Sequence, residues 1–219
     1  DSYVQESIDA GWVPIHPPPG RRPRAFTFTG SNPLRRWPAP QLAREHLWPN
    51  LDLIVAVNFR MSTSALFSDY VLPAAAYYEK NAIKYPQTYL SYVVVAEQAT
   101  KPLGEAKSEW EIFGLLAKRI QERAKERGIG EVKGPHDAPL APSKVFDRWS
   151  NEGEHDPADS RAAMDKMLRT STVTEGIGYD DAVRLGAVKI QSCGPFEPLH
   201  QTSSDYDARD TTTPHGWFV

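Results

Sequence analysis

The sequence predicts an α/β fold with a short parallel sheet flanked by helices, followed by a loop-rich segment. Two strand-like runs, at 25–29 and 51–57, precede a capped amphipathic helix at 109–127. Strands that alternate with helices along a chain are typical of a parallel sheet with helical layers. After residue 130 the sequence turns polar and loses this regularity. We therefore expect the sheet to be built from residues before that point.

Proline-rich stretches mark the borders between three regions. Nineteen of the 219 residues are proline, and many gather in WVPIHPPPGRRP and KGPHDAPLAPS, which are typical of extended connectors. The regions are a loop-rich approach segment over 1–23, the α/β unit over 24–129, and a loop-rich segment with short helices over 130–219.

The first half of the α/β unit begins with a strand over Ala25–Thr29, where β-forming residues alternate. Gly30–Pro33 (GSNP) has the residues of a tight turn. Residues 40–48 predict a short helix with proline near its start. The continuous apolar run Leu51–Val57 predicts a parallel strand that is covered on both faces.

The second half predicts a helical turn at 62–68, a short strand at Tyr70–Leu72 closed by Pro73, and the helix at 109–127. Ser108 and Glu111 form a capping box at the start of this helix, and Gly128 ends it. Its apolar stripe comprises Trp110, Phe113, Leu116, Ala117 and Ile120.

Beyond residue 130 we expect a modest helix over 157–169 and one or two helical turns over 178–188 that end at Gly186. The polar tail at 199–213 predicts an exposed loop.

Composition excludes several classes of protein. The formal net charge of 25 − 28 = −3 gives no general affinity for nucleic acid. The single cysteine, Cys193, excludes an internal disulfide framework and a metal site built from cysteines alone. No apolar run approaches the roughly 18 residues of a membrane span. Because no initiator Met is present and the last residues are apolar, we expect a piece of a longer polypeptide.

Two polar segments, GSNP and NFRMSTS, leave the carboxyl ends of successive predicted strands. Ligands of parallel α/β sheets bind beyond these ends, so the two segments predict a pocket rim. The alternative is that both are only turns. Asn32 offers an amide donor and acceptor to a purine or pterin ring, or simply closes its own turn. Asn58 likewise either contacts a ligand or caps the end of its strand.

The second segment contains three consecutive hydroxyl residues, Ser62, Thr63 and Ser64. Their hydroxyls suit phosphate oxygens, although a role as helix N-cap explains them equally well. The Glu79–Lys80 pair supplies a cation for phosphate or is an ordinary solvated pair. The scattered histidines form no zinc motif, and no phosphate-binding loop, GxGxxG or GxSxG motif is present. The residues themselves thus indicate a ligand-binding α/β domain without a catalytic group.

Three motifs in order resemble the molybdopterin oxidoreductases of the dimethyl sulfoxide reductase family. They are GSNPLR, LDLIVAVNFRMSTSALFSDYVLPAAAYYEK and PLGEAKSEWEIFGLLAKRI, within residues 24–120. The second motif looks most like the branch that contains nitrate and selenate reductases, dimethyl sulfide dehydrogenase, ethylbenzene dehydrogenase and steroid C25 dehydrogenase. The resemblance implies a fragment of a catalytic alpha subunit and a domain that binds one arm of a molybdenum bis(molybdopterin guanine dinucleotide) cofactor.

The family's cofactor contacts carry over to five positions: Asn32, Val57, Asn58, Lys80 and Glu109. Two depart from the common residue, since the family often has Asp at the positions of Asn58 and Glu109. The resemblance places the molybdenum ligand and a [4Fe-4S] cluster earlier in the subunit, so no catalytic residue and no metal ligand is expected here.

The resemblance also implies a reaction, partners and a location. The sequence NAIKYPQTYL after the YEK motif favours anaerobic hydroxylation of a C–H bond in a hydrocarbon or steroid side chain, with reduction of an oxyanion or sulfoxide as the alternative. The expected partners are the rest of the catalytic subunit, an iron–sulfur beta subunit and a haem b gamma subunit. The expected location is the periplasm, with the cytoplasmic face of the inner membrane as the alternative. A nucleotide-binding module without metal chemistry remains a further alternative.

Overall fold

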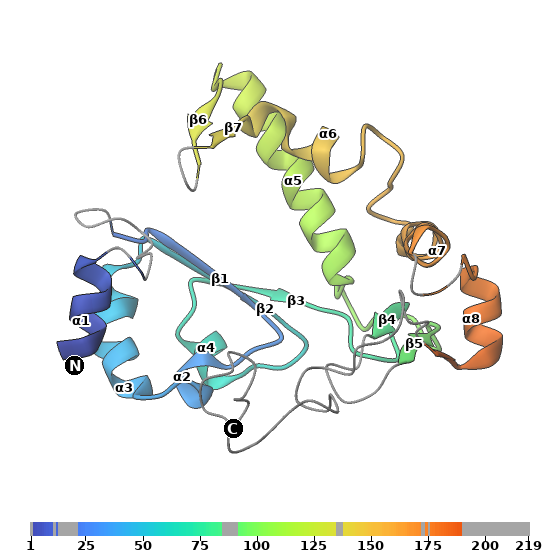
Figure 1. Ribbon diagram of the computed structural model, residues 1–219, viewed down its shortest axis with the longest axis horizontal. Helices are drawn as coiled ribbons and strands as arrows, with labels where there is room; N and C mark the ends of the chain where they lie inside the picture. The colour runs from blue at the N-terminus through green and yellow to red at the C-terminus, as the bar shows by residue number, and fades with distance from the viewer. Residues whose placement is uncertain are drawn as a thin grey trace, which may run out of the picture.

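The fold is described by a computed structural model with two small sheets and one long helix as its main elements (Figure 1). The structure describes residues 2–10, 12, 22–84, 92–134, 138–171, 174 and 176–189. The beginning of the long helix lies between the two sheets, so this helix end is central to the arrangement (Figure 1).

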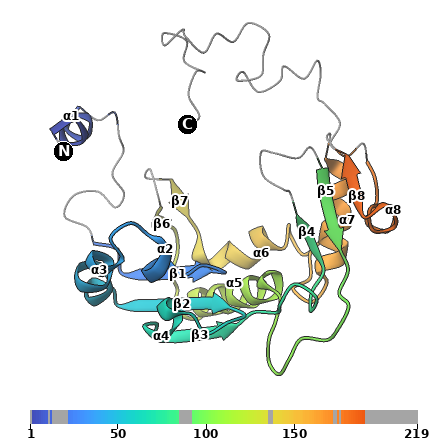
Figure 2. The same cartoon turned by 90° about the horizontal axis from the view of Figure 1, so that it is seen from below.

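The first sheet is parallel, as expected, with the order β1-β2-β3. Its strands are β1 (Ala25–Thr29), β2 (Leu53–Asn58) and β3 (Tyr70–Pro73). In this register Thr29 lies beside Val57, and Asn58 lies beside Pro73. The three carboxyl ends therefore meet at one edge (Figure 2).

One face of this sheet packs into the larger apolar core. Its buried members are Phe28, Leu34, Trp48, Ile54, Ala56 and Ala65. The helices α2 (Pro33–Arg36) and α4 (Thr63–Leu66), which begin just after β1 and β2, contribute Leu34 and Ala65. This face is closed by segments that start at the carboxyl ends of the strands.

The single helix expected over 40–48 is instead a series of three short helical segments. They are α3 (Pro40–Leu42), a π-helical turn η1 (Ala43–Leu47) and a 3-10 turn η2 (Trp48–Asn50). Pro49 lacks an N–H, so regular α-helical hydrogen bonding cannot continue through it. The Trp48 indole N–H donates to the carbonyl of Phe67 over 3.1 Å and anchors the series in the core.

The long helix α5 (Glu109–Glu126) covers part of the opposite face, where Ile112 packs with Val57 and Ala74. The Ser108 hydroxyl caps it by accepting the N–H of Glu111 over 3.2 Å. The second half of the capping box is not formed among the described residues, because the Glu111 carboxylate accepts a hydrogen bond from Lys107 instead. Gly128 follows the helix at a φ of +63°, as its role as terminator requires.

The predicted apolar stripe of α5 is wrong in part. Ala117 is buried, but Phe113, Leu116 and Ile120 are 36%, 45% and 42% exposed. The buried residues of the helix are Ile112, Gly114, Ala117, Gln121 and Ala124. Ile112 packs on the first sheet, whereas Gly114 and Gln121 face a neighbour that the sequence did not reveal, namely helix α6 (Val145–Trp149).

A second, antiparallel sheet with the order β4-β5-β8 was not predicted. Its strands are β4 (Ala82–Lys84), β5 (Tyr92–Ala96) and β8 (Ala187–Lys189). Helices α7 (Ser160–Thr170) and α8 (Tyr179–Leu185) share its core, and Gly186 ends α8 as expected. Because β8 pairs with β5, this unit joins residues on both sides of the expected division at 129–130.

The remaining elements are short. The segment 1–23, expected to be loop-rich, contains the helix α1 (Ser2–Asp9). The expected connector after residue 130 contains the hairpin of β6 (Val132–Lys133) and β7 (Pro139–Leu140) and the 3-10 turn η4 (Pro142–Lys144). The predicted loop at 199–213 lies outside the described residues. Within the described part, every helix is too short or too polar to cross a membrane.

Candidate functional site

The carboxyl ends of β1 and β2 are joined by their own backbone. Gly30 leaves β1 at a φ of +58°, which favours glycine, and its N–H donates to the carbonyl of Val57 over 3.0 Å. Val57 is 1% exposed and packs below the edge. The two polar segments that were expected to form a pocket rim are therefore adjacent.

The Asn32 side chain connects the two segments. Its Oδ1 accepts from the Ser64 N–H over 3.1 Å and from the Ser64 hydroxyl over 2.7 Å. The same hydroxyl accepts the N–H of Leu34 over 2.8 Å, and Ser64 is fully buried. Ser64 is thus committed to internal hydrogen bonds, while the Asn32 Nδ2 donates to none of the described residues.

The other hydroxyls of this segment divide between the two expectations. Ser62 is the N-cap of α4, because its hydroxyl accepts the N–H of Ala65 over 3.2 Å. Thr63 lines a surface pocket of about 300 Å³ together with Arg44 and Phe67. The helix-cap alternative therefore describes Ser62, and Thr63 remains beside open space.

The Asn58 carboxamide is used within the edge. Its Nδ2 donates to the carbonyl of Ser31 and its Oδ1 accepts the N–H of Arg60, both over 3.3 Å. Asn58 is 8% exposed. These bonds join Ser31 to the loop after β2. Asn58 therefore caps the end of its strand, which is one of the two roles expected for it.

Lys80 and Glu109, two residues predicted separately, form an ion pair with each other. Their side chains are 15% and 31% exposed. Glu79 does not pair with Lys80, since its carboxylate accepts the N–H of Ala76 over 2.8 Å. The Lys80 ammonium is therefore held at the first residue of α5.

Backbone hydrogen bonds connect this pair to the sheet edge. The N–H of Ala74 donates to the carbonyl of Asn58 over 3.1 Å, and the N–H of Ala75 donates to Lys107 over 2.8 Å. Lys107 in turn donates its N–H to Pro73 over 3.2 Å. The start of α5 is thereby fixed to the end of β3. The five predicted residues form two groups, one at the ends of β1 and β2 and one at the start of α5.

Exposed aromatic side chains border this edge, and the sequence reasoning missed them. The rings of Phe59 and Tyr77 lie 5.7 Å apart and are 39% and 58% exposed. The Arg60 guanidinium lies 5.2 Å from the centre of the Phe59 ring. The signal was available, because an aromatic residue directly follows the polar end of β2. Aromatic faces of this kind suit stacking with a planar ligand.

A second pocket, of about 250 Å³, opens beside Lys80 at the start of α5. Its lining is polar and includes Asn81 and Gln98, which flank the second sheet, and Arg161 of α7. The carboxylates of Glu79, Glu111 and Asp159 also line it. No group of three metal-binding side chains is present in the described part of the chain. The pocket beside Lys80 thus combines two cations with three carboxylates, whereas the pocket beside Thr63 offers the Thr63 hydroxyl and the Arg44 guanidinium.

Two arginines that precede the first sheet have a structural role. Arg22 and Arg24 both pair with Asp52. The hydrogen bond from Arg24 is the main cause that lowers the pKa of Asp52 below its ordinary value. His155 packs edge-on against Trp110, with ring centres 5.8 Å apart, as a structural residue would.

Comparison with known proteins places these features in a family. The molybdopterin oxidoreductase family model matches residues 21–119. The respiratory nitrate reductase alpha subunit of Haloferax mediterranei is 33% identical over 99% of this chain and 23% of that protein. The dimethylsulfide dehydrogenase alpha subunit of Rhodovulum sulfidophilum is 38% identical over 90% of this chain and 22% of that protein.

A third relative is the perchlorate reductase alpha subunit of Dechloromonas aromatica, which is 34% identical over 82% of this chain and 19% of that protein. The chain thus spans about a fifth to a quarter of the length of these relatives. Because the matched segment holds both polar segments and the Lys80–Glu109 pair, the resemblance seen in the motifs is confirmed. The chain belongs to the molybdopterin oxidoreductase family.

Proposed function

We propose that this chain binds one arm of a molybdenum bis(molybdopterin guanine dinucleotide) cofactor within a catalytic subunit. The observation that carries the proposal is that backbone hydrogen bonds join the strand ends beside Asn32 to the start of α5, where Lys80 pairs with Glu109. Ligands of parallel sheets bind at such an edge. Lys80 offers a cation to a phosphate, and the Asn32 amide offers a donor to a ring or ribose oxygen.

The donors present fit such a group. In the described part of the chain, the N–H groups of Met61, Ser62 and Thr63 donate to no acceptor. Backbone N–H groups ahead of a helix suit phosphate oxygens. The exposed rings of Phe59 and Tyr77 offer a face to a planar base. When bound, the cofactor supplies the redox chemistry, and this chain supplies binding, orientation and electrostatics.

The five predicted contacts have different roles in this proposal. Lys80 and Asn32 are the side chains that contact the cofactor, and Glu109 orients Lys80. Val57 and Asn58 act through the backbone geometry of the strand end, since one is buried and the carboxamide of the other is hydrogen-bonded internally.

Substitution of Lys80 in the full subunit tests the proposal. We expect Lys80→Ala to lower retained cofactor about tenfold, because a charge-assisted hydrogen bond is lost. Cofactor is measured as molybdenum and as guanosine monophosphate released by acid, each per polypeptide. Lys118→Ala is the matched control, because Lys118 is an exposed lysine on α5 that forms no ion pair among the described residues.

A second variant removes the effect of an uncompensated carboxylate. Lys80→Ala combined with Glu109→Gln leaves no unpaired charge at the start of α5. Cofactor loss in this double variant supports a direct contact by Lys80. Normal cofactor content in both variants would contradict the proposal.

For the reaction, we propose two candidates. The sequence after the YEK motif supports anaerobic hydroxylation of a hydrocarbon or steroid C–H bond. The nitrate and perchlorate reductases among the relatives named above support reduction of an oxyanion instead. An alkylaromatic or sterol that reduces ferricenium supports the first reaction, whereas nitrate, perchlorate or chlorate that oxidises reduced viologen supports the second.

We further propose that the chain works within a multisubunit enzyme, since the named relatives are alpha subunits. The proposed partners are an iron–sulfur beta subunit and a haem b gamma subunit, with a [4Fe-4S] cluster elsewhere in the catalytic subunit. The proposed location is the periplasm. Copurification from the native host tests the partners, and fractionation of the cells tests the location. A native complex without molybdenum would favour the alternative of a simple nucleotide-binding module.

A further inference from the structure

The backbone on both sides of Lys80 is held by one neighbouring segment. Before Lys80, the carbonyl of Tyr78 accepts the N–H groups of Ala99 and Thr100 over 2.9 and 3.1 Å. After it, the Asn81 Oδ1 accepts the N–H of Gln98 over 2.9 Å. The next residue belongs to β4, which pairs with the end of β5. The position of Lys80 therefore depends on where the segment 96–100 lies.

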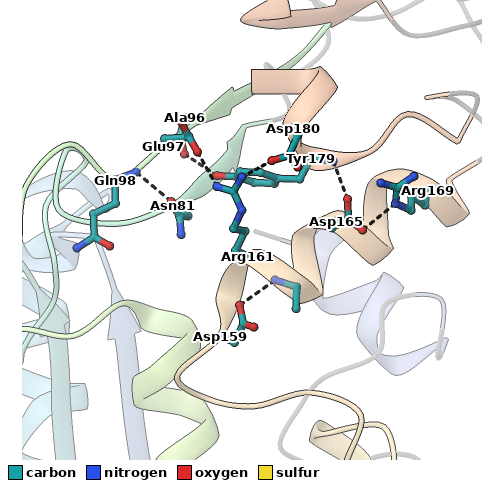
Figure 3. A network of polar contacts seen from close by, with 11 residues as sticks. Asn81, Ala96, Glu97, Gln98, Asp159, Arg161, Asp165, Arg169, Tyr179 and Asp180 are labelled. Atoms are coloured by element: carbon teal, nitrogen blue, oxygen red, sulfur yellow. Dashed lines mark hydrogen bonds and ion pairs between the residues drawn. The ribbon is translucent and has the colours of Figure 1, made fainter. Parts of the chain in front are cut away.

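The start of this segment is fastened by two side chains from other elements (Figure 3). The Arg161 guanidinium, on the first turn of α7, pairs with Glu97 through one nitrogen and with Asp180 of α8 through another. The hydroxyl of Tyr179 donates to the carbonyl of Ala96 over 3.1 Å. Helices α7 and α8 thus hold Ala96, the last residue of β5, and Glu97, the residue after it.

Arginine suits this position better than other cations. Its planar guanidinium directs separate N–H groups to two carboxylates at once, whereas a lysine is a single point charge. The guanidinium also lies over the Tyr179 ring, 4.5 Å from its centre, and Tyr179 is 1% exposed. The ring is therefore fixed by packing, and it in turn fixes the plane of the guanidinium.

Lys80 and Arg161 also face the same open space. Both line the polar pocket of about 250 Å³ at the start of α5, as do Asn81 and Gln98. A shift of residues 96–98 would thus move the wall from which Lys80 extends. The connection runs from Arg161 to Glu97 by an ion pair, along the chain to Gln98, and from the Gln98 N–H to Asn81 by a hydrogen bond.

We propose that Arg161 is a positioning residue that sets the placement of the Lys80–Glu109 pair toward the cofactor. The inference rests on the proposed function, because Lys80 is taken there as a cofactor contact. Arg161 acts through the end of β5 and does not itself contact the cofactor.

The experiment is a double-mutant cycle in the full holoenzyme. Cofactor retention is measured as molybdenum and acid-released guanosine monophosphate per polypeptide after timed incubation. We expect Arg161→Gln to lower retention about threefold, the size expected for loss of the partly exposed Glu97 ion pair, the one of its two pairs that leads toward Lys80. We expect Arg161→Lys to retain more cofactor than Arg161→Gln, because it keeps the charge and one contact.

The decisive comparison is made in the Lys80→Ala background. If Arg161 acts through Lys80, Arg161→Gln adds no further loss there, because coupled sites are not additive. A purely structural Arg161 would lower retention by the same factor in both backgrounds, and that result would overturn the inference. Unchanged retention in Arg161→Gln alone would also overturn it.

Two controls separate other causes. Arg184→Gln removes an ion pair with Asp181 within α8, and we expect normal cofactor retention.

If Lys80→Ala retains its cofactor, the proposed function itself fails. If Lys80→Ala loses cofactor while Arg161→Gln does not, only the inference about Arg161 fails. Should Arg161→Gln not fold, the cycle is carried out with Glu97→Gln, which breaks the same connection from the other side.

Discussion

At the scale of single residues, polar groups near the sheet edge divide into those that hold the edge together and those left for a ligand. Asn32 does both, since its carbonyl oxygen is bonded to Ser64 while its amide nitrogen has no partner among the described residues. Asn58 and Ser64 belong to the first group. Residue type alone did not distinguish them, because hydroxyl and carboxamide groups serve both purposes.

Ser64 is a sharp test of this division. We expect Ser64→Ala to lower the free energy of unfolding by about 1–3 kcal/mol, because it leaves the buried N–H of Leu34 and one bond of Asn32 unsatisfied. Thr63→Ala is the neighbouring control, since the Thr63 hydroxyl bonds to no described residue. Urea denaturation measures both, and equal stability of the two variants would contradict the assigned role of Ser64.

A second residue-scale prediction concerns pH and Asp165. The Arg169 side chain and the N–H of Tyr179 hold the pKa of Asp165 below its ordinary value. Between the unfolded pKa of about 4 and the lower folded pKa, the unfolded state binds more protons. The contribution of Asp165 to stability is thus complete above about pH 4 and is lost as pH falls through the folded pKa.

The variant Asp165→Asn removes this titration. We expect it to be less stable than the parent at neutral pH and to lose stability less steeply below about pH 4. Urea denaturation at a series of pH values measures the slope. Parallel curves for the parent and the variant would exclude the assigned role of Asp165.

At the scale of elements, the buried face of α5 is defined by its contact with α6. Gly114 lies against the Trp149 ring, and an added Cβ would come within 2.6 Å of it. Gln121 accepts the N–H groups of Phe146 and Asp147 over 2.9 and 3.1 Å. A glycine and a glutamine thus occupy buried positions that a purely apolar pattern assigns to large side chains.

This contact yields an element-scale prediction. Gly114→Ala is expected to destabilise the protein by about 1–3 kcal/mol, because the methyl group has no room beside Trp149. The gain in helix propensity of up to about 1 kcal/mol offsets part of that cost. Gly130→Ala meets no atom within 4 Å and is the control. Thermal unfolding measures both variants. A midpoint for Gly114→Ala above that of Gly130→Ala would disprove the close packing.

At the scale of the whole molecule, two small sheets are linked through the start of α5. Lys107 bridges to Ala74 next to the first sheet, and Glu109 pairs with Lys80 just before the second. The Lys80–Glu109 pair therefore lies where the two sheets are joined.

The exposed apolar side chains of α5, such as Leu115 and Leu116, line an open pocket of about 430 Å³ with Leu72 and Pro73.

Local sequence predicted the parallel sheet, both glycine-ended helices and the two polar segments at the ends of β1 and β2. These features depend on interactions between residues close in sequence, such as the apolar run of β2 and the Ser108 cap, so they are visible in short windows. The family motifs placed the five candidate residues, although their individual roles remain predictions.

Only the tertiary structure decided which side chains meet. The second sheet needs β8 to pair with β5, about 90 residues earlier in the chain, and three-residue strands such as β4 and β8 carry too little pattern to predict that pairing. The Lys80–Glu109 pair, the Arg161 contacts and the buried face of α5 likewise join residues far apart in sequence. Sequence by itself determined which segments form elements, whereas long-range packing and pairing of charges determined how those elements place the site.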